Sequence, residues 1–188
     1  MSKTQEFDID ATNDLPKRKL PENLYNLSVF QYPWNWKSWS GFWKNLVYFF
    51  KCLRPGWHRA TKGYCRMDTW NADITICTYL IKVLTEYRNV TNGYPGTEDF
   101  PTFEAWVAYI DKIIDLLVYY TTERDTLNDY YQSWCDECCK TPRSEWGDKQ
   151  EDIYERYIAE NQTLYAAQKA AREKAFAMLG KHLDHIWW

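Results

Sequence analysis

Residues 68–89 read DTWNADITICTYLIKVLTEYRN, and this stretch decides the fold. Its apolar residues recur every three or four positions, which is the period of an α-helix. Asp68 is placed to cap the helix, because Asp is a preferred N-cap residue. Two adjacent apolar stripes predict a helix central to the fold, with only a narrow polar side in water. The first stripe holds Trp70, Ile74, Cys77, Ile81 and Leu84, the second holds Asp73, Ile76, Leu80, Val83 and Tyr87, and the polar side holds Thr75, Thr78, Lys82, Thr85 and Asn89.

A shorter helix is expected before this segment, over about residues 41–53. Ser40 can cap it, and the sequence Arg54-Pro55-Gly56 is expected to end it. Residues 57–67 then form a basic connection. Residues 1–36 contain three prolines and no sustained period, which predicts an extended, partly disordered N-terminal arm.

The second half of the chain contains two further helical patterns. Turn residues occupy positions 92–96, and Thr102 can cap a helix over 103–120 whose period continues more weakly to Cys138. Asp148 can cap a last, alanine-rich helix to about Met178, with Gly180 marking a cap or a bend. The sequence shows no convincing strand alternation, so residues 37–188 are predicted to form an all-α, single-domain helical bundle of about four main helices.

Charge is unevenly distributed along the 188 residues, whose formal net charge is −3. Residues 37–67 hold seven Lys and Arg and no Asp or Glu, whereas residues 68–188 hold twelve basic and twenty-one acidic residues. A local block of cations among aromatic rings can attract an anion even in an acidic protein. These cations could equally pair with carboxylates of the following helices.

The basic aromatic segment is therefore the candidate ligand site. Arginines hold phosphates through forked hydrogen bonds, and aromatic rings stack on bases, so an anion or a nucleotide is the expected ligand. Arg59 and Arg66 would bind the anion, and the ring of Tyr64 or Trp70 would stack against its base. The alternative is a packed loop, with Asp73 a structural carboxylate that pairs with Arg59 or Arg66 or accepts a Tyr or Trp hydrogen bond. The candidate ligand-binding residues are Arg59, Lys62, Tyr64, Arg66, Trp70 and Asp73.

Other chemistry is weakly supported. Asp111 and Asp115, one helical turn apart, could hold a divalent ion. The sequence has no phosphate loop and no nucleophile elbow, so we expect a non-enzymatic protein without a cofactor. Four residues are weak candidates for zinc ligands, because thiolates and imidazoles at these spacings can close a tetrahedral site. They are Cys135, Cys138, His182 and His185.

The N-terminus lacks a cationic, apolar leader, and no apolar run reaches the roughly 20 residues of a spanning helix, so a reduced cytosol is expected. The 41–53 helix carries Phe and Trp on one side and Lys on the other, which leaves a membrane-surface role as a lesser alternative. A homodimer is also possible, because aromatic faces of the C-terminal repeat have no obvious partner within the chain.

Residues 45–120 and the last ten residues resemble a family of small uncharacterised proteins encoded by tailed bacteriophages. The matching motifs are an Arg-x-x-[Arg/Lys]-Gly-Tyr loop, an Asp-x-Trp-Asn-x-Asp helix start and a Gly-Tyr-Pro turn. Lys62 stands where the family has Arg, which weakens forked anion binding there. The matching positions are Arg59, Gly63, Tyr64, Asp68, Trp70, Asp73, Gly93, Tyr94, Pro95, Trp106, Asp111 and Trp187.

This resemblance implies a phage protein that works in the cytoplasm of a host bacterium. The leading hypothesis is stoichiometric capture of a host component, in one version sequestration of a nucleotide immune signal as an anti-defence function. The alternative is a protein–protein adaptor or inhibitor that docks on a host or virion protein through its aromatic surface.

Overall fold

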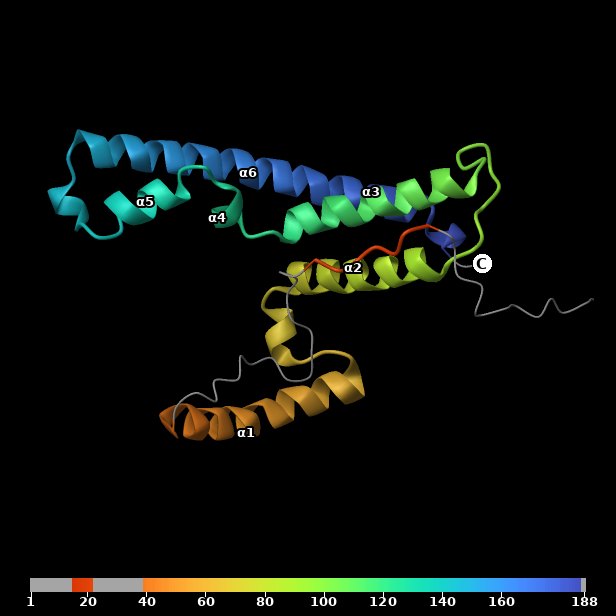
Figure 1. Cartoon of the computed structure of the whole chain (residues 1–188), viewed down its shortest axis with the longest axis horizontal. Coiled ribbons are helices and arrows are strands. Elements are labelled where there is room, and N and C mark those ends of the chain that lie inside the picture. Colours follow the sequence, from red (N-terminus) through yellow and green to blue (C-terminus); the bar gives the residue numbers. More distant parts are fainter. Residues whose placement is uncertain (1–14, 22–38, 187–188) are drawn as a thin grey trace, which may run out of the picture.

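The computed structural model describes residues 15–21 and 39–186, and within these ranges it contains helices and no strands, which confirms the all-α fold class. Short 3₁₀ turns lie between α1 and α2, between α5 and α6, and after α6 (Figure 1). The helices are α1 (Trp39–Lys62), α2 (Ala72–Val90), α3 (Phe103–Thr121), α4 (Arg124–Leu127), α5 (Tyr131–Glu137) and α6 (Asp148–Lys181), and the 3₁₀ turns are Arg66–Thr69, Arg143–Glu145 and Leu183–His185.

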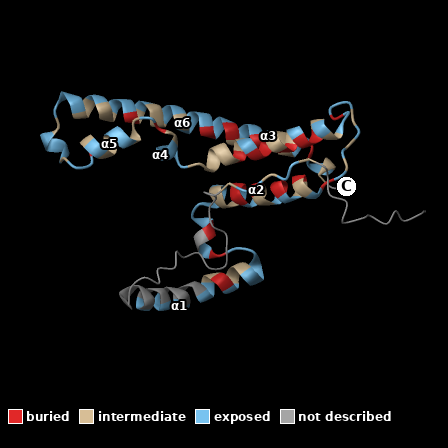
Figure 2. Ribbon diagram, viewed as in Figure 1, coloured by how far each residue is buried: buried red, intermediate tan, exposed pale blue. Residues whose placement is uncertain are grey.

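Helix α3 lies between α2 and α6 and packs along both of them (Figure 1). The packing of α2 by the 103–120 segment agrees with the sequence prediction, but the central helix is α3 rather than α2. The buried side chains gather on α2, α3 and the C-terminal half of α6 (Figure 2). The core residues are Cys77, Ile81, Leu84, Phe100, Trp106, Ile110, Ile113, Ile114, Leu117 and Ala175.

Helix α2 buries Cys77, Ile81 and Leu84 of its first predicted stripe, but beside them it buries residues of the predicted polar side instead of the second stripe. Thr78 and Thr85, which were expected on the solvent-facing polar side, are 0% and 3% exposed, whereas Ile76 and Val83 are exposed. Threonine is small and carries a methyl group, so it can pack against a neighbouring helix as well as face water. The period of the sequence shows that α2 has an apolar side, but it cannot choose between adjacent stripes.

Helix α1 continues through Pro55 to Lys62, so the predicted end at residues 54–56 is wrong. A proline removes one backbone hydrogen bond and strains the preceding turn, but it does not prevent the helix from resuming. The helix ends instead at Gly63, whose φ is 79° and whose N–H donates to the Arg59 carbonyl at 3.0 Å. A left-handed glycine is a common way to satisfy the last carbonyls of a helix.

Asp68 does not cap α2, contrary to the prediction. It lies in the 3₁₀ turn Arg66–Thr69, where its Oδ2 accepts the Cys65 N–H at 2.7 Å. Asn71 takes the N-cap position of α2 without a side-chain cap hydrogen bond. The Thr102 prediction is confirmed, because its Oγ1 accepts the Ala105 N–H at 3.2 Å at the start of α3.

The weaker pattern after residue 120 is two short helices rather than one continued helix. Both lie along the N-terminal half of α6, which is 34 residues long. Trp134 stacks on Tyr157 at 4.6 Å, and the Asn128 amide donates to the Tyr157 carbonyl at 3.0 Å. Helix α6 begins with Asp148, after Gly147 at the N-cap, and includes Gly180, so the C-cap residue is His182 rather than Gly180.

Candidate functional site

The predicted ligand residues do not form one pocket. Arg59 is buried and pairs with Asp68, with its Nε 3.0 Å from Oδ2 and its Nη2 2.5 Å from Oδ1. Their side chains are 7% and 4% exposed. The other four residues before α2 are exposed: Lys62, Tyr64, Arg66 and Trp70.

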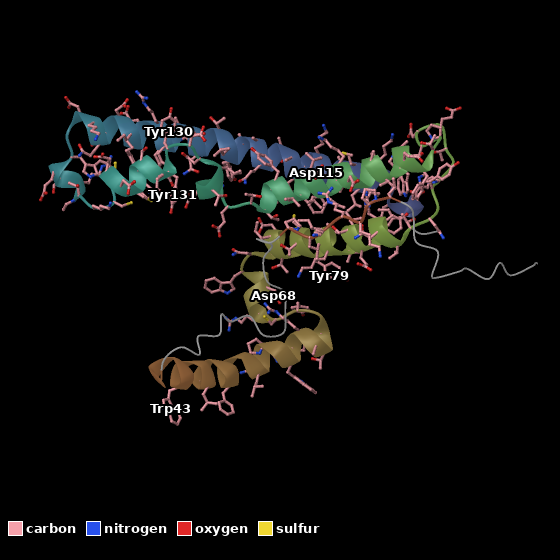
Figure 3. The ribbon with its side chains drawn as sticks, in the orientation of Figure 1. Trp43, Asp68, Tyr79, Asp115, Tyr130 and Tyr131 are labelled. Atoms are coloured by element: carbon pink, nitrogen blue, oxygen red, sulfur yellow. The ribbon has the colours of Figure 1, made fainter. Side chains whose placement is uncertain are left out.

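The carboxylate of Asp68 is held in its charged form by this pairing. Hydrogen bonds from the Arg59 guanidinium, opposed by burial and supported by the Cys65 amide, lower the pKa of Asp68 from 3.8 to about 2. The pair joins the end of α1 to the turn before α2 (Figure 3). In this structure Arg59 is therefore a structural partner of a carboxylate, and that carboxylate is Asp68 rather than Asp73.

Asp73, in the first turn of α2, lines a cleft of about 550 Å³. The cleft lies between the start of α2, the end of α3 and the middle of α6. Four of its residues, Tyr165, Gln168, Lys169 and Arg172, are spaced i, i+3, i+4 and i+7, so they share one face of α6. The remaining lining residues are Asn71, Asp73, Ile74, Tyr120, Thr121, Thr122, Glu123 and Arg124.

One end of the cleft is built around Tyr120. Its hydroxyl donates to the Asp73 carboxylate, which lowers the pKa of Asp73. Burial, together with this hydrogen bond, raises the pKa of Tyr120. The Arg172 guanidinium lies 5.2 Å from the centre of the Tyr120 ring, with its Nη1 3.3 Å from the hydroxyl oxygen. Asp73 therefore accepts a tyrosine hydrogen bond, which was one of the structural alternatives predicted for it from the sequence.

The other end of the cleft is more open. Arg124 lies over the ring of Tyr165, at 5.3 Å from its centre, and Tyr165 is 58% exposed. A smaller hollow of about 300 Å³ continues past this pair, lined by Arg124, Asn161, Gln162 and Tyr165. Lys169 follows Tyr165 by one helical turn and is exposed. Two cations and one exposed ring therefore lie close together at this end.

Gln168 fixes the position of these groups. It is 4% exposed, and its amide donates to the carbonyls of Tyr119 at 3.0 Å and Thr122 at 2.8 Å. These carbonyls are at the end of α3, where they have no partner within the helix. Gln168 thus attaches the C-terminus of α3 to α6 and forms the floor of the cleft.

The electrostatics of the cleft favour an anion. Its lining contains three cations, Arg124, Lys169 and Arg172, and two carboxylates, of which Asp73 already accepts the Tyr120 hydroxyl. The guanidinium groups are held over tyrosine rings by cation–π attraction, which orders them without neutralising them. A phosphate or carboxylate could bind these cations while a planar ring stacks on Tyr165.

Sequence reasoning missed every basic residue of this cleft. The spacing Tyr165-x₃-Lys169-x₂-Arg172 places a ring and two cations on one helix face, and this was the available signal. It lies within the alanine-rich segment, whose small residues indicated close helix packing instead. Ala171 and Ala175 do pack in this way.

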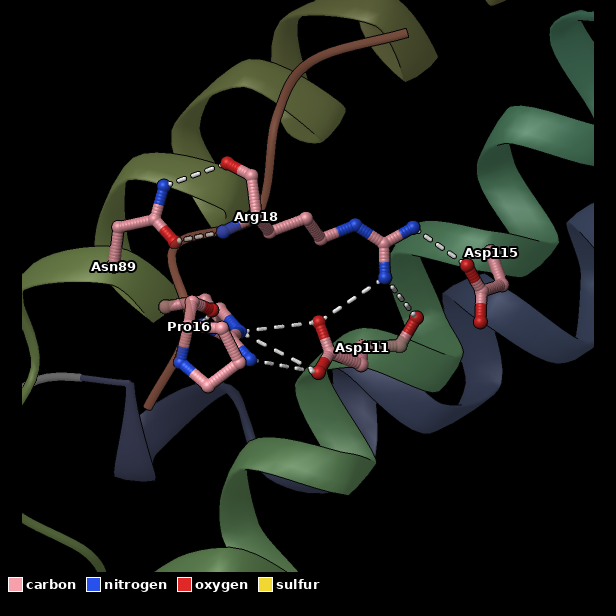
Figure 4. Close-up of polar contacts among 6 residues, drawn as sticks. Pro16, Arg18, Asn89, Asp111 and Asp115 are labelled. Atoms are coloured by element: carbon pink, nitrogen blue, oxygen red, sulfur yellow. Dashed lines mark hydrogen bonds and ion pairs between the residues drawn. The ribbon is translucent and has the colours of Figure 1, made fainter. Parts of the chain in front are cut away.

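Asp111 and Asp115 pair with arginines. Arg18, in the described part of the N-terminal arm, places Nη1 3.1 Å from Asp111 and Nη2 2.5 Å from Asp115 (Figure 4). Arg88 reaches Asp111 at 3.3 Å and donates to the Pro16 carbonyl at 2.6 Å. The backbone N–H of Arg18 donates to the Asn89 Oδ1 at 2.8 Å, and the Asn89 Nδ2 donates to the backbone carbonyl of Arg18 at 2.9 Å. Guanidinium groups thus occupy the place where a divalent ion was considered.

The four weak zinc candidates lie at opposite ends of α6. Cys138 contacts the Gln150 carbonyl, with its Sγ at 3.5 Å, near the start of the helix. His182 follows the end of the helix and packs edge-on against Phe100 at 4.8 Å. Within residues 15–21 and 39–186, no three His, Cys, Asp or Glu side chains are grouped to hold a metal ion.

Comparison of the chain with protein-family models, with curated proteins and with solved structures finds no match. None of the helices in the described ranges has the length and apolar character needed to cross a membrane.

Proposed function

We propose that this protein is a non-enzymatic binding protein that captures an anionic ligand with a planar ring, such as a nucleotide, in the cleft between α2, α3 and α6. The observation that carries the proposal is that Arg124 and Lys169 lie beside the exposed ring of Tyr165 at one end of the cleft, while Arg172 adds a third cation at the other end. The cleft volume of about 550 Å³ suits a ligand of mononucleotide to dinucleotide size.

Each part of such a ligand has a complementary group. Arg124 and Lys169 at the open end offer donors for phosphate oxygens, and the Tyr165 ring offers a face for the base. Asp73 and Glu123 accept hydrogen bonds and could read the amino or hydroxyl groups of the base and sugar. The resemblance to phage proteins favours a host nucleotide signal as the ligand, with an anti-defence role in the bacterial cytoplasm.

Isothermal calorimetry against a panel of mononucleotides, cyclic nucleotides and cyclic dinucleotides tests the proposal. We expect one class to bind, and Lys169→Ala or Arg124→Ala to weaken binding by about 10-fold or more, since each removes a charge-assisted hydrogen bond. The matched control is Lys174→Ala, an exposed lysine of the same helix that does not line the cleft.

Two further variants distinguish the cleft from the basic segment before α2. Arg66→Ala and Tyr64→Ala change exposed residues of the original candidate site, and binding in the cleft should be unaffected by either. Absence of heat with every compound would refute nucleotide capture. If Arg66→Ala lost binding and Lys169→Ala bound normally, the ligand site would lie in the basic segment before α2 and not in the cleft.

A further inference from the structure

Residues 15–21 of the N-terminal arm lie between α2 and α3 and are bound by side chains of both helices (Figure 4). The segment contains neither helix nor strand, so its backbone is open to recognition by its neighbours. The side chains that bind it form the arm site, which consists of Arg88, Asn89, Asp111 and Asp115. The arrangement has the form of a peptide in a binding site, although the peptide and the site belong to one chain.

The end of α2 binds the backbone of this segment. The Asn89 amide accepts the Arg18 N–H at 2.8 Å and donates to the Arg18 carbonyl at 2.9 Å, so one side chain satisfies both backbone groups of one residue. The buried Arg88 donates to the Pro16 carbonyl at 2.6 Å, and because only the carbonyl is used there, a residue without an N–H fits. Hydrogen bonds to the main chain of an extended peptide supply affinity, and side-chain contacts supply specificity. The end of α2 thus provides the sequence-independent part of a peptide site.

The middle of α3 binds one side chain of the segment. Asp111 and Asp115, one helical turn apart, bind the two ends of the Arg18 guanidinium, with Nη1 3.1 Å from Asp111 and Nη2 2.5 Å from Asp115. A lysine ammonium lacks the planar fork that spans two carboxylates, so this pair favours arginine. The flanking Lys17 and Lys19 are exposed, which leaves position 18 as the one that the carboxylates recognise.

The segment is attached with little burial of apolar side chains. Pro16 is exposed, Leu20 is 47% exposed, and Leu15 and Pro21 are only partly buried. Hydrogen bonds each contribute about 1 kcal/mol net, and a segment held mainly by them opens more readily than one anchored in the core. The attachment is therefore reversible, and a second segment with the same groups can replace the arm.

We infer that the arm site binds an extended segment of a partner protein, with arginine at the position of Arg18 and proline accepted two residues before it. Residues 15–21 occupy the site within the chain as a tethered competitor. A tethered ligand has an effective concentration of about millimolar order, so only a partner segment that competes at that level gains the site. The arm site shares no residue with the cleft between α2, α3 and α6, so this inference is independent of ligand capture there.

Fluorescence anisotropy with a labelled synthetic peptide of residues 15–21 tests the inference on full-length chains. Arg18→Ala removes the side chain by which the arm occupies its own site, so the peptide should bind this variant at least about 10-fold more tightly than the wild type. Arg18→Lys keeps the positive charge and should show the same order with a smaller gain. Circular dichroism shows whether each variant is folded, and if Arg18→Ala is not, Arg18→Lys decides.

Two controls separate the arm site from general attraction to an acidic surface. Asp115→Asn, introduced into the Arg18→Ala chain at an exposed position, should weaken peptide binding by about 10-fold. The matched control is Asp152→Asn in the same chain, which changes an exposed carboxylate of α6 and should leave binding unchanged. A peptide with the substitution Arg18→Lys has the same net charge and should bind at least about 10-fold more weakly.

Three results would overturn the inference. Equal binding of the peptide to the wild type and to both Arg18 variants, or no binding to any of them, would show that the arm does not compete for a peptide site. Equal binding of the arginine and lysine peptides would show attraction by charge alone. A wild type that sediments as a dimer, with a monomeric Arg18→Ala chain, would make the arm of a second copy the occupant.

Discussion

The ion pair between Arg59 and Asp68 gives a quantitative prediction for the substitution Asp68→Asn. The reduction of the Asp68 pKa from 3.8 to about 2 corresponds to about 2 kcal/mol of stability at neutral pH. The variant also leaves the buried Arg59 guanidinium without its charged partner, which adds a desolvation penalty. Because both effects act together, we expect a loss of about 2 to 4 kcal/mol.

The pH dependence of this loss follows from the direction of the pKa change. A carboxyl group with a lowered pKa in the folded state contributes its stability above its unfolded pKa, near pH 4, and loses it as the pH falls towards 2. The wild type should therefore be more stable than Asp68→Asn at pH 7, and the difference should shrink between about pH 4 and pH 2. Urea denaturation followed by far-UV circular dichroism measures both quantities.

Asp152→Asn is the matched control, because Asp152 pairs with Arg156 on the surface of α6 and both side chains are 57% exposed. That substitution should change the free energy of unfolding by less than about 0.5 kcal/mol. The reasoning would be refuted if Asp68→Asn were as mild as the control. It would equally fail if the difference from wild type stayed constant from pH 7 to about pH 2.

Three further substitutions test other parts of the structure. Trp106→Ala removes a fully buried ring and its hydrogen bond to Tyr87, so urea titration should show a loss of about 3 to 5 kcal/mol. Asp111→Ala should speed tryptic cleavage in residues 17–19 more than Asp115→Ala does, because Asp111 binds both Arg18 and Arg88. Thr102→Ala removes the α3 cap and should cost about 1 kcal/mol by thermal denaturation, whereas Thr163→Ala, on an exposed turn of α6, should cost less.

The positions of the helices could be predicted from the sequence, and several of their ends could not. The period of apolar residues indicated the helices that the structure places at α2, α3 and α6, because a helix must bury one side. Thr102 was a correct start signal, since its hydroxyl accepts the Ala105 N–H and has no competing partner among the described residues. Asp68 was not, because Arg59, nine residues earlier in the chain, takes its carboxylate. A capping preference is worth about 1 kcal/mol, less than a buried ion pair can impose on the local backbone.

The candidate cleft could not be predicted because its groups come from three helices. A search along the sequence favours dense clusters such as residues 57–70, whereas Asp73, Tyr120 and Arg172 are separated by about fifty residues at each step. The role of Arg18 could not be predicted for the same reason, because its carboxylate partners are more than ninety residues away in the sequence. Within the predicted N-terminal arm, residues 15–21 contain neither helix nor strand, and its other residues lie outside the described ranges.

The 34-residue helix α6 joins two regions of very different packing. Its C-terminal half lies against the hydrophobic core, whereas its N-terminal half packs, among the described residues, against the short helices α4 and α5, where Asn128, Cys138 and Tyr157 are buried. In a continuous helix, the weaker half can fray without breaking the stronger one, so amide exchange should become faster towards residue 148. Unfolding would then begin at that end, and α4 and α5 would detach as a separate cooperative unit while α2 and α3 remain native.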